Sequence, residues 1–93
     1  MITHALLTDM YQFTMMQGLF TQNKHRTRCV FDRFYRTNPF NGAYTVVAGL
    51  EEVIRYVKEL RFSSDDIDYL RQTGVFTEAF LTYLSTFRFT GTI

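Results

Sequence analysis

The chain has 93 residues, of which 46% are hydrophobic and 20% are charged, and its formal net charge is +1. This balance is typical of a globular protein and excludes a disordered tail, and it provides no general attraction to nucleic acid or an anionic membrane. The one long uncharged stretch, residues 10–23, is too short and too polar to span a bilayer, and no secretory signal precedes it. The single cysteine cannot form an internal disulfide, which favours a cytoplasmic protein.

The first predicted element is a helix over residues 9–22, with Thr8 as its N-cap and Asp9 in its first turn. Its apolar side chains form two neighbouring stripes, and its polar residues after Asp9 carry no charge. A helix that is apolar on most of its circumference is expected to be covered by other structure on most sides. With ten Phe and six Tyr, the chain has more apolar bulk than a small independent domain usually needs.

Two predicted strands follow, over residues 28–36 and 44–48, with turn residues between them at 38–42. From Leu50 the apolar period changes from two to about 3.6, which indicates a helix to residue 60. Capping residues then predict helices over 63–74 and 77–87, and residues 88–93 are expected to be extended. The predicted fold class is therefore α+β: one helix, a hairpin-like strand pair, three helices and a terminal strand.

Most catalytic arrangements are missing from the sequence. The glycines are isolated, so no phosphate-binding loop is present. His25 and Cys29 have no third metal-ligand type nearby, and they are interpreted as a surface histidine and a core cysteine rather than a zinc site. The carboxylates of Asp65, Asp66 and Asp68 are interpreted as charges at a helix N-terminus.

One basic run, residues 24–28, has two interpretations. It is either a solvated turn or a phosphate-facing patch that Arg33 and Arg36 continue along the strand. Nucleic-acid binding is weakly supported, because the chain has no excess of positive charge elsewhere.

Tyr11 also has two interpretations. Its ring could pack in a core with the hydroxyl hydrogen-bonded, as amphipathic rings commonly do. Alternatively, a flat ring near the cationic end of a helix could stack on a flat, anionic ligand.

Residues 6–15 (LLTDMYQFTM) closely resemble the opening LLTDxYQxTM of the nicotinate phosphoribosyltransferases. The resemblance continues in order along nearly the whole chain, through residues 31–40, 48–53, 62–70 and 87–91. Two departures stand out, because the family usually has FFR and PFGGxY where this chain has FYR at 34–36 and PFNGAY at 39–44. Asn41 can still adopt a left-handed turn, so the turn is expected to be preserved.

The resemblance implies a type II phosphoribosyltransferase, in which residues 1–93 form an N-terminal α+β segment that is incomplete as a domain and an irregular α/β barrel forms the remainder. Members convert nicotinate and phosphoribosyl pyrophosphate to nicotinate mononucleotide and pyrophosphate in NAD salvage. They require Mg²⁺ and couple the reaction to ATP hydrolysis. Their active sites form between the two subunits of a homodimer.

The resemblance also implies site residues: Tyr11 would stack on the pyridine ring of nicotinate, and Asp9 would help to hold the surrounding loop. The family's phosphorylated histidine, its phosphate-binding residues and its carboxylate-reading arginine have no counterpart here, and His4 and His25 do not match that histidine. No catalytic residue and no metal ligand is therefore expected in this segment, which alone is expected to be inactive. Two alternatives stay open: a nicotinamide-using relative, or a non-catalytic interaction or dimerisation domain.

Overall fold

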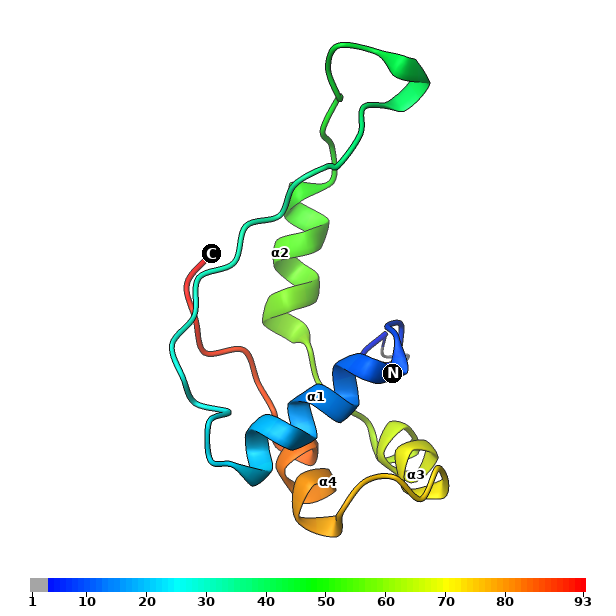
Figure 1. Cartoon of the computed structure of the whole chain (residues 1–93), viewed down its shortest axis with the longest axis vertical. Coiled ribbons are helices and arrows are strands. Elements are labelled where there is room, and N and C mark those ends of the chain that lie inside the picture. Colours follow the sequence, from blue (N-terminus) through cyan, green and yellow to red (C-terminus); the bar gives the residue numbers. More distant parts are fainter. Residues whose placement is uncertain (1–3) are drawn as a thin grey trace.

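Four α-helices and one short 3-10 helix make up the regular structure of residues 4–93, the part of the chain that this computed structural model describes. Helices α1, α3 and α4 gather at one end, α2 extends away from them, and the 3-10 helix η1 lies at the far tip (Figure 1). The bounds are α1 Met10–Thr21, η1 Pro39–Asn41, α2 Leu50–Glu59, α3 Ser64–Gln72 and α4 Glu78–Ser85.

The predicted α+β fold class is wrong for this segment, because residues 4–93 contain no strand. Residues 28–36, 44–48 and 88–93, which were expected to be strands, are extended but pair with nothing within the described range. Their alternating and β-branched side chains suit a pleated surface, but a strand exists only when another strand satisfies its backbone groups. The prediction of strands from this pattern was therefore wrong.

The core lies where α1, α3 and α4 meet. Phe80 of α4 is at its centre, fully buried, with its ring centroid 5.8 Å from that of Phe20 and 5.6 Å from that of Phe76. Phe13 of α1 packs edge-on against Phe62 at 5.9 Å. The buried apolar residues are Ala5, Phe13, Phe62, Ile67, Leu70, Phe80, Leu81 and Leu84.

Much of the remaining apolar surface is uncovered within the described chain. Helix α1 buries Phe13 but leaves Tyr11, Met15 and Leu19 exposed, so only one of its two apolar stripes packs against the other helices. Helix α2 has one apolar face and one charged face, yet none of its residues is buried. Phe31, in the segment that connects α1 to α2 along the chain, has 89% of its surface exposed.

The segment is larger and more open than a compact chain of its length. Its radius of gyration is 15.9 Å, against about 12 Å expected for a compact domain of this many residues. Its accessible surface is 8111 Å², against roughly 5,600 Å² expected for a folded monomer of this mass. Within residues 4–93, no helix is long and apolar enough to cross a membrane.

Helix α3 begins with a reciprocal pair of hydrogen bonds that the sequence predicted in outline. The Asp66 backbone N–H donates to Ser63 Oγ over 3.1 Å, and the Ser63 N–H donates to Asp66 Oδ2 over 2.9 Å. Such a capping box satisfies two backbone donors that the helix itself cannot pair.

Replacing Ser63 with alanine is expected to lower the free energy of unfolding by about 1 kcal/mol, because one cap acceptor is lost. Urea denaturation of the protein measures the change. Ser64→Ala is the matched control, since Ser64 is exposed on the first turn of α3. An equal loss in both variants would contradict the capping account.

Candidate functional site

The start of α1 is shaped by a tight turn that precedes it. The Leu7 N–H donates to the His4 carbonyl over 3.0 Å, and the Thr8 N–H donates to the Leu6 carbonyl over 2.9 Å. The hydroxyl of Tyr56, on α2, donates to the same His4 carbonyl over 3.1 Å. Hydrogen bonds thus join residues 4–8, which lead into α1, to one another and to α2.

Asp9, not Thr8, is the N-cap of α1. Its backbone is extended (φ −76°, ψ 148°), the helix starts at Met10, and its side chain accepts no hydrogen bond from the first turn. Aspartate and threonine both cap helices well, so residue type alone did not decide between them. The turn over residues 4–8 holds Thr8 outside the helix and so moves the start by one residue.

Tyr11 lies in the first turn of α1 with 56% of its surface exposed. The core interpretation of Tyr11 therefore does not describe this segment. The Thr14 hydroxyl donates a hydrogen bond to the backbone carbonyl of Tyr11 over 3.0 Å, and this bond does not involve the Tyr11 ring. Tyr11 and Asp9 both lie at the accessible N-terminal end of α1, and neither lines the hollow beside α3 or the one between α1 and α4.

A shallow hollow of about 170 Å³ lies next to this motif, on the side of α3. Thr8 and Met10 of the motif line it together with Tyr69 of α3, whose ring is largely exposed. Tyr69 was not predicted as part of this region, because nothing in a sequence signals that a residue of a later helix faces an earlier loop. The full lining is Leu6, Thr8, Met10, Phe13, Tyr69 and Leu70.

Gln17, in the middle of α1, makes the longest-range polar contacts of this region. Its Nε2 donates to the Val75 carbonyl over 3.1 Å, and its Oε1 accepts from the Thr77 backbone N–H over 2.8 Å. Both partners lie in the connection between α3 and α4, and Thr77 is the N-cap of α4. In the sequence Gln17 is only one of several uncharged polar residues of this helix, since backbone partners have no sequence signature.

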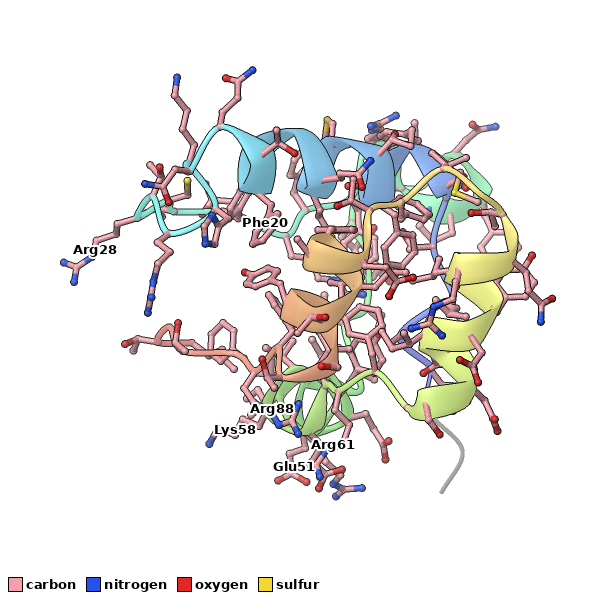
Figure 2. The ribbon with its side chains drawn as sticks, turned by 90° about the horizontal axis from the view of Figure 1, so that it is seen from below. Phe20, Arg28, Glu51, Lys58, Arg61 and Arg88 are labelled. Carbon is pink, nitrogen blue, oxygen red and sulfur yellow. The ribbon has the colours of Figure 1, made fainter. Side chains whose placement is uncertain are left out.

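The opposite end of α1 carries a cluster of aromatic rings. Figure 2 shows Phe20 on the side of α1 that faces α4, and its ring stacks on Tyr83 with the centroids 5.0 Å apart. The ring of His25 lies 5.0 Å from both, and its Nδ1 is buried without a hydrogen-bond partner in the described chain. His25 is therefore half-buried rather than a surface histidine, whereas Cys29, expected in the core, is exposed.

The charged groups of the described chain are mostly on its surface. Arg28, in the basic run, points away from the helices (Figure 2). Arg71 forms hydrogen-bonded ion pairs with Asp68 of its own helix at 2.6 Å and with Glu78 at 2.8 Å, and the pair with Glu78 ties α3 to the start of α4. The hydrogen bond from Arg71 lowers the pKa of Glu78 below its ordinary value of 4.5, so this tie weakens only as the pH falls through that lowered pKa. Among residues 4–93, no three His, Cys, Asp or Glu side chains gather as metal ligands.

Comparison with known proteins decides the family. A family model described as the nicotinate phosphoribosyltransferase (NAPRTase) N-terminal domain matches residues 6–93. The chain belongs to the nicotinate phosphoribosyltransferase family. The resemblance of residues 6–15 to this family is thereby confirmed.

Several nicotinate phosphoribosyltransferases are similar in sequence to this chain. The Dictyostelium discoideum protein is 43% identical over 81 residues, which are 86% of this chain and 14% of that protein. The Caenorhabditis elegans protein is 45% identical over 71 residues, 76% of this chain and 13% of that protein. The Bacillus subtilis (strain 168) protein is 35% identical over 77 residues, 83% of this chain and 16% of that protein. The chain therefore spans only a small part of the length of these relatives.

Proposed function

We propose that this chain is the N-terminal segment of a nicotinate phosphoribosyltransferase, a parent protein that converts nicotinate and phosphoribosyl pyrophosphate to nicotinate mononucleotide and pyrophosphate. The observation that carries the proposal is the match of residues 6–93 to the N-terminal domain of that family. The relatives described above, which share 35% to 45% of the aligned residues, bear that enzyme's name.

In this reaction the ring nitrogen of nicotinate forms a bond to C1 of the ribose, and pyrophosphate leaves with the electron pair of the broken C–O bond. The segment's part in the proposal is to bind and orient the pyridine ring. Tyr11 offers an exposed aromatic ring at the N-terminal end of α1, and such rings stack on flat partners. Asp9, at the N-cap, is assigned to holding the loop that precedes the ring.

Mg²⁺ and ATP complete the proposed chemistry in the parent protein. Following the family resemblance, the proposal assigns the binding of both to other parts of the parent. The homodimeric, cytoplasmic parent is likewise part of the proposal.

The proposal also holds that residues 1–93 are incomplete as a domain and are completed by the remainder of the parent and by its partner subunit. The supporting observation is the roughly 2,500 Å² of accessible surface in excess of that expected for a compact monomer. An excess of this size is comparable to the area that obligate interfaces bury. On this account the isolated segment is inactive.

The experiment is a steady-state assay of the full-length parent with phosphoribosyl pyrophosphate, Mg²⁺ and ATP, and with either nicotinate or nicotinamide. We expect kcat/KM for nicotinate to exceed that for nicotinamide by at least about 100-fold, as polar recognition sites achieve. The isolated 93-residue chain, assayed in parallel, is expected to form no product.

Two outcomes would contradict the proposal. A preference for nicotinamide would place the parent among the nicotinamide-using relatives. No turnover of either substrate by the full-length protein would favour a non-catalytic interaction domain.

A further inference from the structure

The connection between α3 and α4 is held against α1 by one amide side chain. Gln17 Nε2 donates to the Val75 carbonyl over 3.1 Å, while the Thr77 N–H donates to Gln17 Oε1 over 2.8 Å. The side-chain amide of Gln17 thus donates one hydrogen bond and accepts another, as a backbone peptide group does between paired β-strands. Within residues 4–93, no other hydrogen bond joins α1 to this connection.

The remaining contacts between α1 and its neighbours are apolar. Phe13 meets Phe76 edge-on at 6.4 Å, and Phe20 meets Phe80 at 5.8 Å. Hydrophobic contacts are non-directional and tolerate a small rotation of a helix about its axis. Hydrogen bonds weaken steeply when their angle changes, so the Gln17 pair adds a directional restraint on the rotation of α1 that the packed rings do not supply.

That rotation decides where Tyr11 points. Tyr11 lies six residues before Gln17 on the same helix, about 9 Å along its axis. Since side chains extend about 5–6 Å from the helix axis, a rotation of about 20° moves a ring by about 2 Å. A misplacement of about 1 Å can cost a reaction roughly 100-fold when a group must be aligned with its substrate.

We propose that Gln17, bonded to Val75 and Thr77, is a positioning residue of the nicotinate site that acts through Tyr11. This inference rests on the proposed function. It assigns Gln17 to substrate recognition rather than to stability alone, although Gln17 itself does not touch the substrate.

Two substitutions in the full-length parent test the assignment. Gln17→Met removes both hydrogen bonds while keeping the length of the side chain. Gln17→Glu keeps an acceptor for the Thr77 N–H but cannot donate to the Val75 carbonyl, because an ionised carboxylate only accepts. We expect both to raise KM for nicotinate by about tenfold, the lower end of the effect of losing the Tyr11 stack, with KM for phosphoribosyl pyrophosphate unchanged within about twofold.

Arg71→Ala is the matched control, because it removes the ion pair between α3 and the start of α4 without touching α1. It is expected to leave KM for nicotinate within about twofold of the unaltered value, since exposed ion pairs contribute little. A double-mutant cycle adds a second readout. If Gln17 acts through Tyr11, then Gln17→Met made in a Tyr11→Ala background should raise KM for nicotinate no further.

The assignment is overturned if Gln17→Met and Gln17→Glu change KM for nicotinate and KM for phosphoribosyl pyrophosphate by the same factor. It is also overturned if the double variant raises KM for nicotinate by the product of the factors measured for Gln17→Met and Tyr11→Ala. It is also overturned if KM for nicotinate in either Gln17 variant is the same as in Arg71→Ala. A parent that turns over nicotinate while the Gln17 variants behave normally would refute this inference alone. A parent that does not turn over nicotinate at all would refute the proposed function, and this inference with it.

Discussion

Tyr11→Ala in the full-length parent is expected to raise KM for nicotinate and to lower kcat/KM by about ten- to a hundredfold. The estimate takes the stacking of a flat heterocycle on an aromatic side chain as worth about 1–3 kcal/mol, as measured for nucleic-acid bases. The ring of Tyr11 is exposed at the start of α1, so its removal creates no cavity in the core of this segment. Steady-state kinetics with nicotinate as the varied substrate measures the effect.

Two controls separate stacking from other causes. Tyr11→Phe keeps the ring and is expected to retain most of kcat/KM. Met15→Ala alters the next exposed residue of the same apolar stripe and is expected to leave the nicotinate kinetics unchanged. Unaltered kinetics in Tyr11→Ala would show that Tyr11 has no part in substrate binding and would return it to a packing role.

Phe80→Ala is expected to cost about 3–5 kcal/mol of unfolding free energy, the range for deleting a buried aromatic ring. Phe80 has no exposed surface, and its ring lies within 6.4 Å of the rings of Phe20, Phe76 and Tyr83. Because α1 and α4 meet on this ring, the loss should loosen α1 as well. Urea denaturation of the parent, followed at the transition of this segment, measures the change.

Thr82→Ala is the matched control for Phe80→Ala, since Thr82 lies on the exposed side of the same helix. It is expected to change the unfolding free energy by less than about 0.5 kcal/mol, as surface substitutions usually do. A loss below 1 kcal/mol in Phe80→Ala would contradict the assignment of the core to the α1–α3–α4 junction.

The four helices were predictable because their signals are local. The apolar period after Leu50 gives α2, and the hydroxyl and carboxylate of Ser63 and Asp66 mark the start of α3. Each depends on residues within one or two helical turns of each other, which the sequence displays directly.

The strands were not predictable in the same way. Residues 28–36 carry a strand pattern, but a strand needs a partner, and none lies within the described chain. Propensity for β-structure measures how well side chains fit a pleated surface, and it does not say whether that surface forms.

The candidate site shows the same contrast between local signals and contacts with distant residues. Tyr11 and Asp9 were predicted as site residues from the motif in which they lie, and they stay predictions. Gln17 was missed, because its partners Val75 and Thr77 are 58 and 60 residues away and offer only backbone groups. The choice of Asp9 over Thr8 as N-cap was missed because a turn over residues 4–8 sets it.

The central claim is that the opening of α1 contributes the ring of Tyr11 to the nicotinate site. A crystal structure of the full-length parent with bound nicotinate tests it most directly. The account predicts that the Tyr11 ring lies over the pyridine ring, with centroids about 4.5–7 Å apart as in stacked aromatic pairs. Nicotinate bound with no Tyr11 ring, of its own subunit or of the partner, in contact with it would contradict the account.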